Sequence, residues 1–297
     1  MTKINHTRIN LIKEIKTNGY IVYNNIAIDY SDKEGLFIIG LKSFKCNEII
    51  FEDEPYYQTF SESKYKYKYC NICYKEKVNG SLLCKHCEEL YPNGMKELIN
   101  KNEEYLHQTS MEYNIYKYGT DSIETKLVRS VITKNDIPDL KISDEKNELL
   151  GLMISELLDI HNNIESNKFG IFENNDNKKV IGTAYFPYIC FMNHSCEPNT
   201  KFNHRFFGKR SVIANRDIEK FEKITLNYIE TDVSQYKRRE KLLKNYGTSC
   251  YCDICLTCFY CESKLKLKNC NKCKIALYCS KECQIADWKN HKKDCKC

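Results

Sequence analysis

The chain has 297 residues, including 18 cysteines, and its 46 basic and 40 acidic residues give a net charge of +6. This excess is small for such a length, so we do not expect direct nucleic-acid binding. No apolar run approaches the roughly 18 residues that a membrane span needs, and we expect no membrane association. We therefore expect a soluble, intracellular protein of the cytoplasm, the nucleus or both, whose cysteines bind zinc rather than form disulfides.

The first 60 residues are predicted to form one helix followed by short strands. An apolar face at Leu11 and Ile15 predicts a helix over Ile4 to Lys16. Runs rich in Ile, Val, Tyr and Phe, separated by polar turns, predict strands at Tyr20 to Tyr30, Leu36 to Ile39 and Ile49 to Phe51.

Residues 61 to 120 contain paired cysteines. Two Cys-x-x-Cys knuckles lie about ten residues apart, at Cys70 and Cys73 and at Cys84 and Cys87. Four thiolates at this spacing suit one tetrahedral zinc, so we interpret the segment as an inserted zinc ribbon. The alternative is a set of scattered buried thiols, which two paired knuckles in so short a segment make the poorer explanation.

Two helices are predicted in residues 121 to 170. Apolar residues four apart predict the first, over Asp121 to Lys134, with Asp121 and Glu124 as a variant of the capping box. A broader apolar face predicts the second, over Asp144 to Asn163. Both are interpreted as core-forming helices, and neither is assigned a chemical role.

The second half of the chain returns to strands around two polar motifs. The first is Asn-His-Ser-Cys-Glu-Pro-Asn, at residues 193 to 199, and the second is Ile-Thr-Leu-Asn-Tyr, at residues 224 to 228. The alternative for this pair is a polar loop followed by an edge strand. A basic helix is then predicted over Ser234 to Tyr246, stopped by Gly247. Its basic residues are interpreted as a solvated face: Lys237, Arg238, Arg239, Lys241 and Lys244.

The C-terminal part holds two further cysteine-rich patterns. Cys250, Cys252 and Cys255 form Cys-x-Cys-x-x-Cys, which supplies three ligands and is one short of a closed structural zinc site. Eight possible ligands follow at once: Cys258, Cys261, Cys270, Cys273, Cys279, Cys283, His291 and Cys295. Cys255 and Cys258 are themselves spaced as Cys-x-x-Cys, so the boundary between the two patterns stays open. Cys46, Cys190 and Cys297 are left over as plain thiols.

The two polar motifs resemble the signature segments of the SET domain, a lysine-methyltransferase fold that binds S-adenosylmethionine. The turn at Gly35 resembles the Gly-x-Gly turn near the start of that domain. The resemblance implies that Tyr228 is the catalytic tyrosine, whose hydroxyl points at the transferring methyl group. It also implies that Asn193 and His194 hold the amino-acid and adenine ends of the cofactor, with Gly35 and Asn167 as further cofactor contacts.

The eight C-terminal ligands resemble a MYND finger, including its Tyr278-Cys279 pair and Trp288. The resemblance implies two zinc ions in a cross-brace, in a finger that folds only with metal. One ion would be bound by Cys258, Cys261, Cys279 and Cys283, and the other by Cys270, Cys273, His291 and Cys295. In SET proteins with a post-SET motif, the cysteine of the first signature completes a further site, which implies a zinc bound by Cys196, Cys250, Cys252 and Cys255.

Some features depart from the family pattern. Lys33 replaces the first glycine of the Gly-x-Gly turn, and Phe221 replaces the glycine of the usual Gly-Glu-Glu-Ile-Thr run. Thr248 stands where an aromatic residue usually packs on adenine. The SET-and-MYND family, the closest resemblance, carries its MYND finger inside the SET domain, whereas here the finger follows it.

The sequence therefore predicts a β-rich SET domain with inserted helices and small zinc-bound satellites. Its predicted parts are the N-terminal SET segment (1–60), a zinc-ribbon insert (61–120), a helical insert (121–170), the C-terminal SET segment (171–248), the post-SET motif (249–257) and the MYND finger (258–295). The implied activity is S-adenosylmethionine-dependent methylation of a lysine in a histone or another protein. The alternative is a catalytically inactive adaptor whose MYND finger docks proline-containing peptides. Tyr228 favours the enzyme, and Lys33, Phe221 and Thr248 favour the adaptor.

Overall fold

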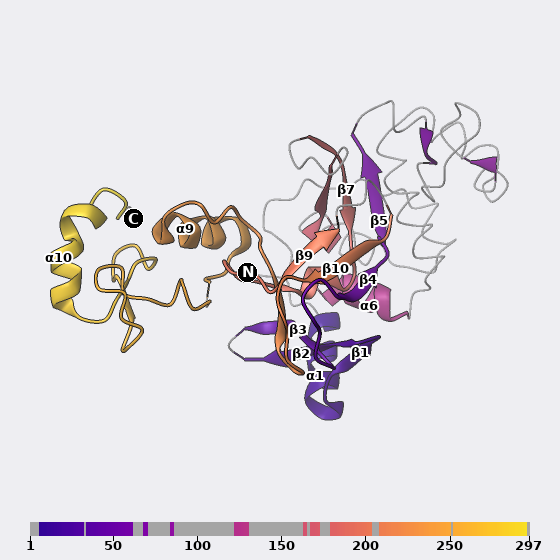
Figure 1. Ribbon diagram of the computed structural model, residues 1–297, viewed down its shortest axis with the longest axis horizontal. Coiled ribbons are helices and arrows are strands. Elements are labelled where there is room, and N and C mark those ends of the chain that lie inside the picture. The colour runs from indigo at the N-terminus through magenta and orange to yellow at the C-terminus, as the bar shows by residue number, and fades with distance from the viewer. Residues whose placement is uncertain are drawn as a thin grey trace.

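Figure 1 shows a computed structural model of the protein, in which a β-rich body carries a small C-terminal finger at one end. The structure describes residues 6–32, 34–61, 68–70, 84–85, 122–130, 163–164, 167–172, 179–203, 208–250 and 252–295. Within these residues short strands predominate over helices, which confirms the predicted fold class. No helix among them combines the length and the apolar character that crossing a membrane requires.

The N-terminal elements follow the predicted order. They are α1 (His6–Asn18), β1 (Ile21–Tyr23), β2 (Ile26–Ser31), β3 (Gly35–Gly40), β4 (Ile49–Asp53) and β5 (Tyr57–Phe60). Leu11 and Ile15 of α1 are buried in the main core, as their spacing predicts. The stretch predicted as strand over Tyr20 to Tyr30 forms the hairpin of β1 and β2. Its turn is the Asn24-Asn25 pair, where Asn24 adopts the positive φ of 52°.

The middle elements are α6 (Ile123–Ser130), β6 (Phe169–Phe172), β7 (Val180–Tyr185), the 3-10 turn η1 (Ile189–Phe191), β8 (Asn193–His194), β9 (Thr200–Asn203), β10 (Arg210–Ala214) and β11 (Lys223–Leu226). The α6 helix lies inside the helix predicted over Asp121 to Lys134. Its cap is Ser122 and not the predicted Asp121, because the Ser122 hydroxyl oxygen accepts a hydrogen bond from the Thr125 N–H. Glu124 instead accepts a hydrogen bond from the Tyr188 hydroxyl. The helix predicted over Asp144 to Asn163 lies outside the described residues apart from its last residue, Asn163.

The C-terminal elements are α9 (Gln235–Tyr246), β12 (Lys268–Asn269), β13 (Leu277–Tyr278) and α10 (Lys281–His291). The α9 helix has the predicted ends: Ser234 accepts from the Lys237 N–H, and Gly247 takes the left-handed φ of 64° that a C-cap glycine adopts without strain. In Figure 1 α9 lies between the β-rich body and the finger that contains α10.

A five-stranded sheet brings the two polar motifs together. Its strand order is β1-β2-β3-β11-β8. The β11 strand is antiparallel to β3 and parallel to β8, and the parallel register places Thr225 opposite Asn193 and Leu226 opposite His194. Motifs that lie far apart in the chain are therefore neighbours across two strands.

Two three-stranded sheets, in the orders β4-β10-β9 and β5-β7-β6, complete the body around one apolar core. Asp53, at the end of β4, is buried, and its Oδ2 accepts hydrogen bonds from the backbone N–H groups of Tyr188 and Ile189 at 2.9 and 2.8 Å. These bonds hold the start of η1, which leads directly into Asn193. A buried carboxylate thus fixes the approach of the chain to the first polar motif.

Candidate cofactor pocket and zinc centres

A pocket of about 440 Å³ lies where β8, β11 and the segment after α9 meet. This volume is within the range of about 300 to 1,000 Å³ that is typical of small-molecule sites. Its lining combines both polar motifs with the post-SET segment: Glu34, Asn193, His194, Ser195, Lys223, Thr225, Tyr228, Leu242, Gly247, Thr248, Ser249, Cys250 and Cys252. The predicted catalytic tyrosine and the two main predicted cofactor residues therefore share one pocket.

Tyr228 is held at its side chain and at its backbone. Its hydroxyl donates to the Met192 carbonyl at 2.7 Å, and its N–H donates to His194 Nδ1 at 3.0 Å. Burial raises the pKa of Tyr228, so the hydroxyl keeps its proton across the physiological range. The ring of Tyr246 lies beside it, with centroids 4.9 Å apart.

His194 connects the pocket to the cysteines. Burial lowers the pKa of His194 to about 4, so its imidazole is neutral near pH 7. Because Nδ1 accepts from the Tyr228 N–H, the ring proton is on Nε2, which lies 3.3 Å from Cys196 Sγ. The side chain that orients Tyr228 therefore also contacts a predicted zinc ligand.

Asn193 and an ion pair supply the remaining polar wall. Asn193 lines the pocket, and its side-chain amide makes no hydrogen bond to the described part of the chain, so its donors and acceptor are available to a ligand. Lys223 Nζ lies 2.6 Å from Glu34 Oε2, and 4.6 Å from the centre of the Phe37 ring. Sequence reasoning missed this pair, although Glu34 adjoins Gly35 and Lys223 precedes the second motif.

The other two predicted cofactor residues lie differently. Gly35, beside the pocket residue Glu34, has a φ of 74°, a left-handed conformation that favours glycine, and a Cβ added there would lie 3.3 Å from Arg8 Nη2. Asn167 does not occur among the described residues that line the pocket. Its side-chain amide instead donates to the Asn163 carbonyl at 2.9 Å.

The departures from the family pattern have separate structural contexts. Phe221 adopts the left-handed φ of 67° that its usual glycine would take, but its side chain is exposed and is not part of the described pocket wall. Thr248 does line the pocket, and the neighbouring Tyr246 places an aromatic ring against Tyr228. Lys33 lies outside the described residues.

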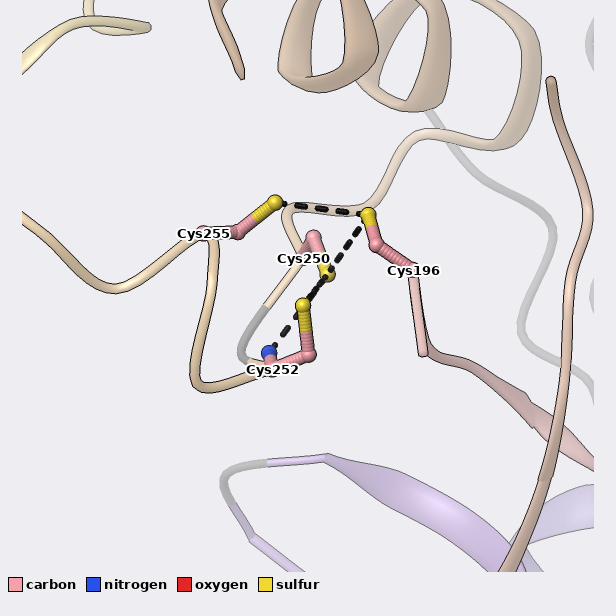
Figure 2. A group of neighbouring side chains, drawn as sticks. All are labelled: Cys196, Cys250, Cys252 and Cys255. Atoms are coloured by element: carbon pink, nitrogen blue, oxygen red, sulfur yellow. Dashed lines mark hydrogen bonds between the residues drawn. The ribbon is translucent and has the colours of Figure 1, made fainter. Parts of the chain in front are cut away.

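Four cysteines meet beside the pocket, and Figure 2 shows their sulfurs converging from two segments of the chain. Cys196 Sγ lies 3.4 Å from that of Cys255 and 3.9 Å from that of Cys250, and Cys250 Sγ lies 3.2 Å from that of Cys252. A tetrahedral zinc with bonds of about 2.3 Å separates its sulfurs by about 3.8 Å. This set of four free thiols therefore fits one zinc ion.

The finger contains two more such groups. Ligand atoms within 4.8 Å of one another form the sets Cys258, Cys261, Cys279 and Cys283, and Cys270, Cys273, His291 and Cys295. The structure thus groups Cys255 with Cys196 and Cys258 with Cys261, at the boundary that spacing alone left open. In the predicted ribbon, Cys70 is buried and Cys84 half-buried, while Cys73 and Cys87 lie outside the described residues.

The basic face of α9 is not uniformly solvated, which corrects the sequence interpretation. Lys237 and Lys244 are exposed, but Arg239 is only 4% exposed. Arg238 Nη1 donates to the Val233 carbonyl at 2.6 Å, and its Nη2 lies 3.8 Å from Cys255 Sγ. The reason is tertiary: the cysteine-rich segments that follow the helix fold back onto it.

A larger cavity, of about 640 Å³, lies between β4, Tyr188 and α6 and contains neither polar motif. Its charged groups largely satisfy one another: Glu52 accepts from Lys209 and from the Ser211 hydroxyl, and Glu124 accepts from Tyr188. Although this cavity is the larger of the two, it contains no residue of either polar motif, so we do not choose it as the candidate cofactor site.

Comparison with known proteins identifies the family. The SET domain model matches residues 35–229, which is more than half of the chain. The chain belongs to the SET domain family. The MYND finger model matches residues 252–295, so this SET protein carries a MYND finger after its SET domain. Both resemblances noted in the sequence are confirmed.

Among relatives of this SET protein, a SET and MYND domain-containing protein of Dictyostelium discoideum is 25% identical over an alignment of 277 residues, which covers 89% of this chain and 67% of that protein. Histone-lysine N-methyltransferase ATXR2 of Arabidopsis thaliana is 46% identical over 78 residues, covering 25% of this chain and 16% of the plant protein. Histone-lysine N-methyltransferase SMYD3 of Homo sapiens is 46% identical over 85 residues, covering 28% of this chain and 19% of the human protein. The matches to the plant and human relatives thus span less than a fifth of their length.

Proposed function

We propose that this SET protein is an S-adenosylmethionine-dependent protein-lysine N-methyltransferase. The observation that carries the proposal is the position of Tyr228, on the wall of a pocket that also contains Asn193 and His194 and adjoins the four-cysteine cluster. The names of the plant and human relatives support a lysine in a histone or another protein as the substrate.

The pocket residues fit the proposed cofactor. Bound S-adenosylmethionine supplies a methyl group activated by a positively charged sulfonium. The free side-chain amide of Asn193 can both donate to and accept from the polar amino-acid end. Asn193 and, through its backbone, His194 would hold the cofactor next to Tyr228, and binding both reactants in one site would remove most of the entropy cost of aligning them.

Tyr228 contributes an oxygen to the transition state. Its hydroxyl proton is used in the hydrogen bond to Met192, so the oxygen lone pairs remain free to face positive charge. Charge spreads over sulfur, carbon and nitrogen during methyl transfer, and a preorganised oxygen is worth most where that charge develops.

The target lysine must lose its proton before it can attack. A model lysine has a pKa of about 10.4, and a site that excludes water lowers this value because burial disfavours the ammonium form. The partly buried ring of Tyr228 contributes to such a surface, and Tyr246, which is 43% exposed, borders it. The two rings would contact the lysine stem, and the ammonium group would release its proton to solvent before the amine attacks.

Zinc has a structural role in this proposal. The three described ligand sets each hold one ion, and a predicted ribbon of Cys70, Cys73, Cys84 and Cys87 holds a fourth. The ion shared by Cys196 and the post-SET cysteines pins the C-terminal segment against the loop that carries Asn193. Zinc thiolates need reduced cysteines, which supports an intracellular location in the cytoplasm, the nucleus or both.

Two measurements test the enzyme. Calorimetric titration of the metal-replete protein with S-adenosylmethionine should show saturable binding, and transfer of a labelled methyl group into a cell extract should label a protein band. Tyr228→Phe is the matched control, because it should keep binding and lose the label. A parent protein that neither binds the cofactor nor labels any band would overturn the proposal.

The exposed apolar surface of the finger supports a second function, the docking of proline-containing peptides. Ile285 and Trp288 lie three apart on α10 and are 65% and 41% exposed, and Tyr260 is also exposed. Proline-containing peptides pack on exposed aromatic side chains. Trp288 is the single tryptophan of the chain, so its fluorescence reports this contact directly. A saturable change on titration with such peptides is expected, and an unchanged spectrum would exclude docking at Trp288.

A further inference from the structure

One buried arginine joins the MYND finger to the cofactor pocket. Arg239 Nε donates to the Ile275 carbonyl at 2.8 Å, and its Nη1 donates to the Cys250 carbonyl at 3.1 Å. Ile275 belongs to the finger and lies two residues after the ligand Cys273. Cys250 belongs to the post-SET cluster and lines the pocket. A single rigid guanidinium therefore bonds the backbone of both modules.

Two neighbours on α9 strengthen the same contact. The Tyr236 hydroxyl donates to the Asp294 carbonyl in the finger, and the Tyr236 ring lies 5.7 Å from that of His291. Gln235 Nε2 donates to the carbonyls of Cys255 and Thr257, at 2.8 and 3.2 Å. The finger is thus packed on α9 through side chains and not only attached by the chain.

The other end of α9 leads directly into the pocket wall. Leu242 is fully buried, packs with the four-cysteine cluster and lines the pocket. Gly247 ends the helix, and the pocket residues Thr248 and Ser249 follow it. The helix therefore carries the finger on its first half and the pocket wall at its C-terminal end.

We propose that Arg239 is a positioning residue of the cofactor pocket, and that through it the MYND finger is a structural part of that pocket. The inference rests on the proposed cofactor function of the pocket. When the ligand set that includes His291 holds zinc, it fixes the finger backbone at Ile275. The two hydrogen bonds of Arg239 then hold Cys250 at a fixed position relative to that backbone. Loss of metal from the finger therefore loosens the pocket wall and lowers cofactor affinity.

This role uses groups of the finger other than the exposed side chains proposed for peptide docking, although the Trp288 ring lies 6.0 Å from that of His291. Ile285 and Trp288 of α10 are exposed, whereas the finger groups that contact α9 include the Ile275 and Asp294 carbonyls and the buried His291. A finger that served only for docking would not need a buried guanidinium, whose desolvation is costly unless its donors are satisfied.

The first test compares Arg239→Met with Arg239→Lys and with Lys237→Met, a matched change at an exposed position of the same helix. Cofactor affinity is measured by calorimetry, and the alkylation rate of each cysteine by mass spectrometry. Arg239→Met loses the charge-assisted hydrogen bonds to both Cys250 and Ile275, so it should weaken S-adenosylmethionine binding about tenfold and should speed alkylation of Cys250. Lys237→Met should match the parent, and Arg239→Lys should fall between. A folded Arg239→Met protein with parental affinity and parental alkylation would overturn the inference.

The second test changes a zinc ligand of the finger, and it decides whether the finger positions the pocket wall if Arg239→Met does not fold. His291→Gln should remove one zinc, as counted by native mass spectrometry, and should weaken cofactor binding although His291 is not part of the described pocket wall. Zinc loss with unchanged affinity would overturn the inference. If the parent binds no cofactor, the proposed function fails, and alkylation of Cys250 then decides alone: faster reaction in both variants supports the positioning role, and parental rates refute it.

Discussion

The hydroxyl of Tyr228 and the imidazole of His194 depend on each other. The Tyr228 N–H occupies His194 Nδ1, while the Tyr228 hydroxyl is held by the carbonyl of Met192, two residues before His194. Rotation of either side chain would break a buried hydrogen bond, which costs more than an exposed one because no water replaces it. The Tyr228 hydroxyl is therefore held in one position before any ligand binds.

Tyr228→Phe tests this oxygen. The phenyl ring keeps the packing against Tyr246, so cofactor affinity should stay close to that of the parent. Turnover should fall on the order of 100-fold, equivalent to about 3 kcal/mol of transition-state stabilisation. The turnover number on an identified substrate and the dissociation constant of the cofactor check the two halves of the expectation. Turnover within about twofold of the parent would remove Tyr228 from the mechanism.

A second expectation at the residue scale is that Asp53 makes the stability of the fold depend on pH. Burial, together with the nearby Glu124 and Glu54, raises the pKa of Asp53 from its ordinary 3.8 to about 7, against the lowering effect of the backbone hydrogen bonds from Ile189 and Tyr188. The folded protein therefore holds this proton more tightly than the unfolded chain. Between about pH 4 and pH 7 the unfolded chain has lost this proton while the folded protein still binds it. The free energy of unfolding that Asp53 contributes therefore falls as the pH rises through this window, and it does not change further above about pH 7.

Asp53→Asn removes this titration while keeping an oxygen that can accept from η1. The free energy of unfolding of the parent, relative to that of the variant, should fall by roughly 1.4 kcal/mol for each pH unit inside the window. Denaturant unfolding of both proteins at a series of pH values measures the difference. Parallel curves for the two proteins would show that Asp53 titrates as an ordinary carboxyl group.

At the scale of elements, β5 and β7 approach unusually closely. A Cβ added at Gly182 of β7 would lie 2.1 Å from the Thr59 carbonyl oxygen and 3.0 Å from Phe60 Cα, both of which are backbone atoms of β5. Backbone cannot move aside as a flexible side chain can. The pairing of these strands, which forms part of the main core, therefore requires glycine at this position.

Gly182→Ala should consequently destabilise the protein by about 3 kcal/mol, the upper part of the usual range for overpacking a closed interior. The expected observation is a lower midpoint of denaturant unfolding with an unchanged slope. Gly208→Ala serves as a control, because a Cβ there meets nothing within 4 Å, although its φ of 87° adds some strain. A Gly182→Ala protein as stable as the parent would contradict the close contact between the strands.

For the whole molecule, the cysteine groups join segments that share little apolar surface. The four-cysteine cluster connects the first polar motif with the post-SET segment, and the finger has only a small core built largely from its own ligands. Metal binding in such modules contributes folding free energy directly. Zinc content and cofactor binding should therefore change together.

Metal-replete protein should contain about four zinc ions, three in the described groups and one in the predicted ribbon. Elemental analysis that finds two or fewer would contradict this assignment. Cys196→Ser should lose one ion and also weaken cofactor binding, because Cys196 follows β8, the strand formed by Asn193 and His194, after one residue. Unchanged affinity in that variant would mean that another residue completes the post-SET site.

Local signals in the sequence determined much of this protein. The ends of α9 follow from Ser234 and Gly247, and the strands from runs of β-branched and aromatic residues, because caps and periodicity act over only a few residues. The cysteine spacings and the two polar motifs likewise indicated the family and its zinc chemistry, because ligands for one metal recur at short, regular intervals.

Tertiary structure alone decided which distant side chains meet. Arg239 looked like one of five basic residues on an exposed face, yet folding buries it between Cys250 and Ile275. Arg210 faces the rings of Phe169, Phe186 and Phe202, and Glu34 pairs with Lys223. Such contacts depend on how β11 inserts between β3 and β8 and on how the finger packs on α9. Periodicity carries no information on either arrangement, because each is set by the burial of surfaces from segments far apart in the chain.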